Sequence, residues 1–520
     1  MSELNGAQSL IRTLVDAGVD VCFANPGTSE MHFVAALDTV PEMRGVLALF
    51  EGVVTGAADG YARIADKPAA TLLHLGPGLG NGLANLHNAR RAHTPIVNVV
   101  GDHATYHKQY DAPLESDIEA LAGSLEGWVR RSEHTKDVGA DAAAAVAAAQ
   151  DAPGRVATLI LPADASWGEG GETCAPIPPR VPQAVDATTV KDVAAVFGTG
   201  EPVALLIGGS ACREEGLRAA SRIAAATGAK VFVETFPSRL ERGEGLPTIE
   251  RLGYLAEQVA YQLDGIKHLV VAGTKAPVSF FAYPGKPGDL VPEGAQVHTL
   301  AAVGQDVTRA LDEVAGLVAA DTEPVLQQAS RPALPSGPLT PQNWVDVIGA
   351  LLPENAIIAD EANTSGLLLP TATAGAPRHD VLTLTGGAIG YGMPVATGAA
   401  VAAPDRPVLN LQSDGSALYT ISALWTQARE NLNVTTVLLN NRAYAILRLE
   451  LQRVGAASDG PKANDLLDLS RPDMDFVKIA EGMGVPATRA TTAQELAEQL
   501  QRAFAEPGPH LIDAVVPPLF

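Results

Sequence analysis

The sequence predicts an α/β protein with three doubly wound parallel-sheet domains. Short β-rich runs alternate with longer Ala-rich segments of helical period, and the β-rich runs are apolar without polar alternation. Such runs are typical of parallel strands that helices cover on both faces, and ligands of these sheets bind at the carboxyl ends of the strands. Representative runs are PIVNVV at 95–100, PVALLI at 202–207, HLVVA at 268–272 and TTVLL at 435–439.

The division into three domains follows from length and from two proline-rich stretches. A chain of 520 residues with 47% hydrophobic content exceeds the roughly 100–200 residues of one domain. The stretches at 167–186 and 323–342 lack apolar periodicity and are interpreted as linkers. They leave an N-terminal domain at 1–166, a central domain at 187–322 and a C-terminal domain at 343–520, each of ordinary domain size.

Charge and cysteine content narrow the class of ligand and the compartment. The formal net charge of -23 and the lack of a dense Lys/Arg run argue against nucleic acid and anionic membranes as partners, so a small molecule is expected. Three cysteines without paired spacing predict neither a disulfide framework nor a cysteine metal site. The N-terminus lacks a basic start followed by an apolar core, and no run reaches the roughly 18–20 apolar residues that span a bilayer. A cytoplasmic location is expected.

The most specific motif lies in the C-terminal domain. Asp414-Gly415-Ser416 follows the apolar run 407–411, and Asn440-Asn441 closes the next strand-like run, so that Asp414 and Asn441 are 441 − 414 = 27 residues apart. This arrangement resembles the diphosphate-binding motif of thiamine diphosphate enzymes. The resemblance implies that Asp414, Asn441 and the backbone carbonyl of Ala443 bind Mg²⁺, which prefers oxygen ligands. Ser416 and the start of the following helix would then hold the diphosphate.

Two further segments carry the same resemblance, and one position departs from it. The glycine-rich segment 386–394 resembles the one that supports the cofactor, and Ile389 matches the bulky apolar residue that wedges between the two cofactor rings and bends the molecule. Thr364, after the strand-like run 356–360, is a candidate for a diphosphate contact. Ser413 stands where the family usually has Gly before the Asp, and a side chain there tightens the turn.

Glu51 resembles the catalytic glutamate of the family. It follows the apolar run 46–50 and opens the small-residue segment 52–63, where poor solvation favours sharing a proton with a ligand nitrogen. The resemblance implies that Glu51 hydrogen-bonds N1′ of the aminopyrimidine and promotes the imino tautomer that removes the C2 proton. The ylide would attack a 2-oxo acid, carbon dioxide would leave, and an enamine would remain. The expected cofactor-binding residues are Glu51, Thr364, Gly387, Ile389, Asp414, Gly415, Ser416, Asn441, Ala443 and Tyr444.

The family also implies an assembly, because its glutamate and its diphosphate site belong to different subunits. A homodimer or homotetramer with the active site at a subunit interface is therefore expected.

On the substrate side, the segments 25–30 and 72–78 resemble benzoylformate decarboxylase, and acetolactate synthases share parts of the pattern. Thr28 occupies the position of a serine that meets the substrate carboxylate. His74 occupies that of a histidine that relays protons, a role suited to an imidazole near neutral pH. A second family histidine should fall within 276–283, where Ala282 is the nearest match. Its absence brings carboligation to a second carbonyl into consideration beside aldehyde release.

Some residues keep two interpretations. His103 and His107 are candidates for the replacement acid, and their spacing is also that of a zinc pair, although no Glu follows His103 as in a metalloprotease helix. Phe280, Phe281 and Tyr283 form either an apolar substrate wall or core and interface packing.

Three functional hypotheses follow. The first is a thiamine diphosphate- and Mg²⁺-dependent lyase, a 2-oxo acid decarboxylase and carboligase. The second is an acetolactate synthase-type transferase that condenses two 2-oxo acids. The third is a non-catalytic homologue, and the argument against it is that Glu51, Ile389, Asp414 and Asn441 are all in place. The central domain, with Gly208-Gly209 after a strand, resembles one that binds flavin in acetolactate synthases and only packs in other relatives. FAD is thus left open.

Overall fold

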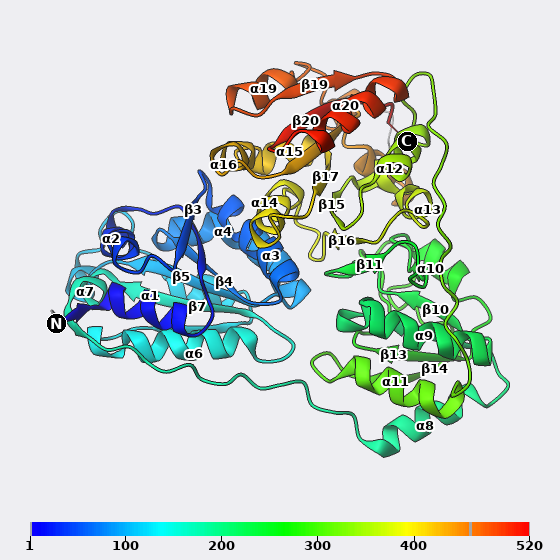
Figure 1. Cartoon of the computed structure of the whole chain (residues 1–520), viewed down its shortest axis with the longest axis horizontal. Coiled ribbons are helices and arrows are strands. Elements are labelled where there is room, and N and C mark those ends of the chain that lie inside the picture. The colour runs from blue at the N-terminus through cyan, green and yellow to red at the C-terminus, as the bar shows by residue number, and fades with distance from the viewer. Residues whose placement is uncertain (1–2, 457–459, 519–520) are drawn as a thin grey trace.

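The computed structural model describes residues 3–456 and 460–518, which form three large sheets and one two-stranded sheet. Figure 1 shows the first large sheet in blue and cyan, the second in green, and the third mainly in yellow to red. A long extended connection leads from the first to the second. The predicted α/β class with parallel sheets is confirmed. Over the described residues, no helix has both the length and the apolar content needed to cross a bilayer.

The first sheet has six parallel strands in the order β3-β2-β4-β5-β7-β6. Its inner strands are buried on both faces: in β5, Val97 and Val99 join one hydrophobic cluster, whereas Ile96 and Val100 join another. This explains the apolar runs without alternation. The strands are β2 (Val21–Ala24), β3 (Arg44–Leu47), β4 (Ala69–Leu73), β5 (Ile96–Asp102), β6 (Trp128–Arg131) and β7 (Val156–Pro162), and the helices are α1 (Gly6–Asp16), α2 (Met31–Ala36), α3 (Glu51–Ala65), α4 (Leu75–Ala92), α5 (Ile118–Gly123), α6 (Val138–Gln150) and α7 (Ala163–Trp167). β1 (Leu4–Asn5) and β8 (Glu169–Gly171) form the two-stranded antiparallel sheet.

The second sheet has five parallel strands in the order β12-β10-β9-β13-β14. The chain runs outward from β9 through β10 to β12 and then returns to β13 on the other side of β9. The strands are β9 (Val203–Ile207), β10 (Lys230–Val233), β12 (Glu250–Arg251), β13 (His268–Ala272) and β14 (Gln296–Ala301), and the helices are α8 (Ala187–Phe197), α9 (Glu214–Thr227), α10 (Ala256–Gln262) and α11 (Val307–Val318).

The third sheet has the order β11-β16-β15-β17-β18-β20-β19, and only β11 runs antiparallel to its neighbour. β11 (Leu240–Arg242) comes from the stretch predicted as central domain, so the chain crosses between these two units more than once. The other strands are β15 (Ala356–Glu361), β16 (His379–Thr383), β17 (Val408–Ser413), β18 (Val434–Asn440), β19 (Ala487–Ala490) and β20 (His510–Val515), and the helices are α12 (Asn343–Leu351), α13 (Leu369–Ala372), α14 (Gly392–Ala402), α15 (Asp414–Thr420), α16 (Ala423–Arg429), α17 (Ala445–Arg453), α18 (Pro461–Leu466), α19 (Phe476–Gly482) and α20 (Ala493–Ala505).

Helices α3 and α14 join the first sheet to the third (Figure 1). Their backbones touch, because a Cβ on Gly398 would stand 1.8 Å from the carbonyl oxygen of Ala57 and one on Gly60 would stand 2.1 Å from that of Val395. One hydrophobic cluster therefore runs from the first sheet through both helices into the third.

A buried ion pair stabilises this junction. Arg63 on α3 donates to both carboxylate oxygens of Asp59, at 2.8 and 2.6 Å, and the exposed fractions of the two side chains are 2% and 0%. The same guanidinium donates to the carbonyl oxygen of Thr383 at 2.9 Å, the hydroxyl of Tyr391 at 3.0 Å and the carbonyl oxygen of Ser238 at 3.1 Å. Arg63 thus connects all three regions of the chain.

The Arg63→Met variant is expected to lose about 3–5 kcal/mol of stability, since it leaves the carboxylate of Asp59 buried without a cation. Urea unfolding followed by circular dichroism measures the loss. The matched control is Arg309→Met, which removes an exposed pair with Glu313 on α11 and should change stability by less than about 1 kcal/mol. Equal stability of both variants would contradict the assigned importance of Arg63.

Candidate active site

The predicted metal ligands lie together at the carboxyl edge of the third sheet. β17 and β18 are neighbouring parallel strands, with Ser413 paired to Leu439, so Asp414 and Asn441 follow adjacent strand ends. The Asp414 carboxylate accepts the backbone N–H of Arg442 at 2.6 Å, and the Asn441 side-chain oxygen accepts that of Ala443 at 2.9 Å. The structure therefore brings Asp414, Asn441 and Ala443 to one place.

The electrostatics of Asp414 fit a bound cation. Asp414 is 1% exposed, and burial raises the pKa of its carboxyl to about 6, although hydrogen bonds from backbone N–H groups oppose this rise. Within 3–456 and 460–518, no Lys, Arg or His forms an ion pair with it. An unpaired buried carboxylate is costly, and a divalent cation bound to oxygen ligands would compensate it. The residues present fit Mg²⁺.

Beside Asp414, hydroxyl and amide groups form a polar cradle. Gln412 donates to the Ser416 hydroxyl at 2.7 Å, and Asn363 donates to the Ser413 hydroxyl at 2.6 Å. Ser413, the departure from the family motif, donates to the carbonyl oxygen of Glu361 at 2.9 Å and so ties β17 to β15. The predicted contact residue Thr364 directly follows Asn363.

Glu361 holds the turn that contains Ile389. The sequence patterns did not single out Glu361. Its carboxylate accepts the backbone N–H groups of Gly390, Tyr391 and Gly392 at 2.8, 3.0 and 2.7 Å. It is 1% exposed, and burial raises its pKa while these N–H donors oppose the rise. An acidic residue at the end of a predicted strand was the only signal for it in the sequence.

The first sheet contributes Glu51 at the start of α3. Its carboxylate accepts a hydrogen bond from the Asn81 side chain at 3.0 Å, and a Cβ on Gly78 would stand 3.2 Å from it. The Asn85 amide donates both to the carbonyl oxygen of Gly52 at 2.8 Å and to that of Gly390 at 3.2 Å. The backbone next to Glu51 and the backbone next to Ile389 therefore lie close to each other.

His74 is held by a second buried carboxylate that the sequence did not single out. Its Nδ1 lies 2.9 Å from Glu30, which is 1% exposed and also accepts the backbone N–H of Gly27 at 2.7 Å. A carboxylate only accepts, so Nδ1 carries the hydrogen and Nε2 is the basic nitrogen of the neutral ring. The predicted residue Thr28 is exposed on the same turn.

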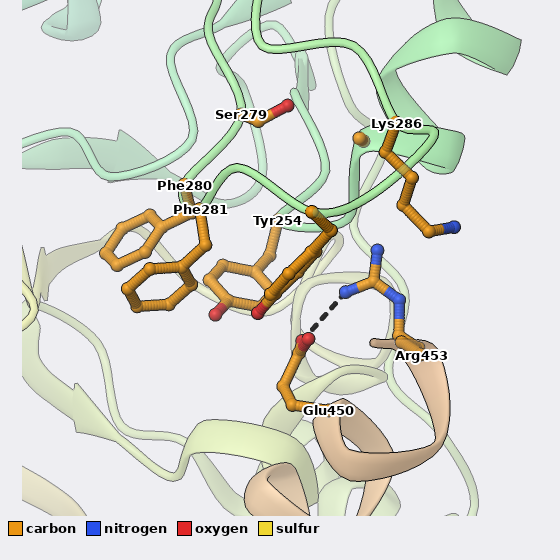
Figure 2. Close-up of a pocket in the computed structure, with 9 residues that line it drawn as sticks. Tyr254, Ser279, Phe280, Phe281, Lys286, Glu450 and Arg453 are labelled. Carbon is orange, nitrogen blue, oxygen red and sulfur yellow. Dashed lines mark hydrogen bonds and ion pairs between the residues drawn. The ribbon is translucent and has the colours of Figure 1, made fainter. Parts of the chain in front are cut away.

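Figure 2 shows the aromatic loop after β13, whose residues Phe280 and Phe281 lie beside Tyr254 and near Glu450 and Arg453 of α17. The Phe280 ring packs in a tilted arrangement against Tyr254 and edge-to-face against Phe281, at ring-centroid distances of 5.1 Å each, and a Cβ on Gly387 would stand 2.9 Å from the Phe280 ring. Arg453 on α17 donates to Glu450 at 2.8 Å, a contact drawn in Figure 2. The loop thus reaches the predicted cofactor segment, with Phe280 and Phe281 about half exposed.

The two remaining histidine candidates, His103 and His107, stack at 5.4 Å on the segment after β5. No group of three His, Cys, Asp or Glu residues suited to a metal is found in the described part of the chain.

Comparison with known proteins identifies the family. The pattern "Thiamine pyrophosphate enzyme, N-terminal TPP binding domain" matches residues 4–122, and "C-terminal TPP binding domain" of the same family matches 369–514. The chain belongs to the thiamine pyrophosphate enzymes. Thiamine pyrophosphate is another name for thiamine diphosphate, so the cofactor class inferred from the motifs is confirmed.

Three relatives of this thiamine pyrophosphate enzyme cover nearly its whole length. A Mycobacterium tuberculosis (strain H37Rv) protein with the provisional name of an acetolactate synthase large subunit is 68% identical, covering 99% of this chain and 100% of that one. Benzoylformate decarboxylase of Pseudomonas aeruginosa is 30% identical, covering 95% and 96%. The solved thiamine diphosphate-dependent 4-hydroxybenzoylformate decarboxylase of Rhodococcus jostii RHA1 shares the fold, with a TM-score of 0.87, 24% identity and 99% coverage of both chains.

The raised pKa of Asp414 predicts how cation binding depends on pH. Because folding raises this pKa from its ordinary value near 4 to about 6, the carboxyl favours the folded state below about pH 4, and that contribution is lost as the pH rises through 6. Above about pH 6 a bound cation would replace the missing proton. Mg²⁺ with thiamine diphosphate should therefore raise the melting temperature more at about pH 7.5 than at about pH 5.5. Asp414→Asn should remove this difference, and an equal rise at both pH values in the wild type would contradict it.

The Glu361→Gln variant should bind thiamine diphosphate and Mg²⁺ roughly 10–100-fold more weakly, as is usual when a group supporting a cofactor site is replaced. A glutamine amide has one acceptor oxygen, so it cannot satisfy three converging N–H donors. Titration calorimetry measures the affinity, and the exposed Glu354→Gln variant is the control. Unchanged affinity of Glu361→Gln would show that the turn forms without the carboxylate.

Proposed function

We propose that this protein is a Mg²⁺- and thiamine diphosphate-dependent lyase that decarboxylates a 2-oxo acid, in the manner of a benzoylformate decarboxylase, and also joins the product to a second carbonyl. The observation that carries the proposal is the placement of Asp414 and Asn441 at the ends of the neighbouring strands β17 and β18, where a cation and a diphosphate would be held. The similarity to benzoylformate decarboxylase along nearly the whole chain supports it.

The residues divide into those that hold the cofactor and those that handle the substrate. Asp414, Asn441 and the carbonyl of Ala443 would bind Mg²⁺, and Ser416 with its neighbours would contact the diphosphate. The bound cofactor would supply a nucleophilic carbon for the substrate carbonyl and an electron-accepting ring for the bond pair that decarboxylation leaves behind. Glu51 would hold a proton at N1′ of the pyrimidine. Ile389 would lie between the two rings of the cofactor and keep the cofactor in a bent conformation.

On the substrate side, Thr28 would donate to the substrate carboxylate. His74 would give and take a proton at Nε2, because Glu30 fixes the hydrogen of Nδ1 and orients the ring. Phe280 and Phe281 would form an apolar wall suited to an aryl or branched 2-oxo acid. With alanine at position 282, the loop offers no imidazole there, which favours carboligation as an accompanying reaction.

The second candidate is an acetolactate synthase-type transferase, favoured by the provisional name of the 68% identical relative. This transferase would use the same cofactor residues as the lyase and would differ in the acceptor, which would be a second 2-oxo acid. A non-catalytic homologue is disfavoured because Glu51, Ile389, Asp414 and Asn441 are all in place.

The site would be completed by a second subunit in a homodimer or homotetramer. Large apolar side chains beside the site are exposed in the single chain, among them Leu49 at 51% and Tyr419 at 55%. Apolar surface of this kind is typical of an interface. We place the active site there.

The Glu51→Gln variant should retain cofactor binding but lose roughly 10²–10⁴-fold in kcat, the usual contribution of proton transfer by a positioned group.

The wild type is first incubated with benzoylformate, branched 2-oxo acids and pyruvate, with and without an acceptor aldehyde. Aldehyde or hydroxyketone products support the lyase, whereas acetolactate from pyruvate supports the transferase. The exposed Glu42→Gln variant is the control, and unchanged turnover of Glu51→Gln would refute the proposal.

A further inference from the structure

The central sheet has the topology of a dinucleotide-binding fold. β9 lies at its centre, and the chain leaves β9 toward β10 on one side and β13 on the other. In such sheets a dinucleotide binds in the crevice at the carboxyl ends of the two strands where the order reverses, with its phosphates at the start of the following helix. Here that crevice lies between β9 and β13, next to Gly208-Gly209 and the start of α9.

A carboxylate of the chain itself occupies this glycine turn. Glu234, the residue after β10, accepts the backbone N–H of Gly209 at 3.1 Å and the hydroxyl of Thr274, after β13, at 2.9 Å. A Cβ on Gly208 would stand only 2.7 Å from the same carboxylate. The N–H group and the hydroxyl that would meet a phosphate are therefore already bound to an anion.

The crevice is also closed by direct contact between its two walls. The N–H of Gly208 donates to the carbonyl oxygen of Ala272 at 3.0 Å, and a Cβ on Gly273 would stand 2.6 Å from the carbonyl oxygen of Gly208. Ser210 lies within hydrogen-bond distance of Thr308 on α11, at 3.3 Å. The two walls of the crevice are therefore in contact at these points, and Glu234 fills the space beside the glycine turn.

The start of α9 is acidic as well. The backbone N–H of Glu214 donates to the Glu241 carboxylate at 2.7 Å, and Glu214 and Glu215 both lie in the first turn. The nearby cations are already paired, Arg213 with Asp66 and Arg218 with Glu214. A diphosphate placed here would meet negative charge where a helix start ordinarily offers positive charge.

We infer that the central domain is a dinucleotide-type fold closed by its own Glu234 carboxylate, so that this enzyme carries no flavin there. The raised pKa of Glu234, caused first by burial, agrees with a carboxylate enclosed by the protein. The inference is independent of the proposed reaction, because a decarboxylase and a transferase would use the same thiamine diphosphate site. It separates this enzyme from a flavin-containing acetolactate synthase.

The test uses the full-length enzyme loaded with thiamine diphosphate and Mg²⁺, so that the diphosphate site of the third sheet is filled. Absorbance at visible wavelengths and chromatography of the denatured protein measure flavin content, and calorimetry measures binding of ADP and FAD. The wild type should contain no flavin and bind both ligands only weakly. Glu234→Ala frees Gly209 and Thr274 and should bind ADP at least ten-fold more tightly than the wild type, with Glu234→Gln intermediate.

Glu313→Ala, on the exposed side of α11, is the matched control for loss of one negative charge and should bind ADP no better than the wild type. Circular dichroism and unchanged cofactor-dependent activity verify that the variants fold. Flavin in near-stoichiometric amount in the wild type would overturn the inference. So would a folded Glu234→Ala variant whose affinity for ADP equals that of the wild type. Loss of all 2-oxo acid turnover in the wild type would bear on the proposed reaction and leave this inference intact.

Discussion

The backbone contact between α3 and α14 is the constraint on which the site depends. The two helices approach so closely that glycine is required at positions 60 and 398, and the Arg63–Asp59 pair fixes the junction from within. α3 begins with Glu51, and α14 begins three residues after Ile389. A slip of one helical turn would move either start by about 5.4 Å. Within one chain, the position of Glu51 relative to the Ile389 turn is therefore set by a tightly packed helix interface rather than by loops.

Buried carboxylates carry out most of the positioning around this interface, and their partners distinguish their tasks. Glu361 accepts three backbone N–H groups, Glu30 holds the ring of His74, and Glu234 fills a glycine turn. Each of these three has donors supplied by the protein. Asp414 also accepts backbone N–H groups and is as buried as Glu361, and neither carboxylate has a Lys or Arg partner among the described residues. Asp414 differs from the other three carboxylates in its place beside Asn441 at adjacent strand ends, and for this reason we propose this pair as the cation site.

The sequence predicted what depends on local pattern. Uninterrupted apolar runs gave the parallel sheets, and the strand-end motifs gave Asp414 and Asn441, because neighbouring parallel strands place their carboxyl ends side by side. The tasks of Glu361 and Glu30 were missed since their partners lie 29–31 and 44 residues away and depend on the register of the fold. β11 was missed because three residues carry no periodic signal. The roles of the site residues and the domain boundaries remain predictions.

The three sheets share one topology class but present different chemistry at their carboxyl edges. The first presents Glu51 and His74, which suit proton transfer, and the third presents Asp414 and Asn441, which suit a metal diphosphate. The second presents Glu234 against its own glycine turn. For a chain of net charge -23, an anionic ligand needs a local source of positive charge. The third edge would obtain it from the proposed cation, whereas the second edge has already satisfied its donors with a carboxylate. Of these two edges, the third is therefore the one suited to hold a phosphate-bearing cofactor.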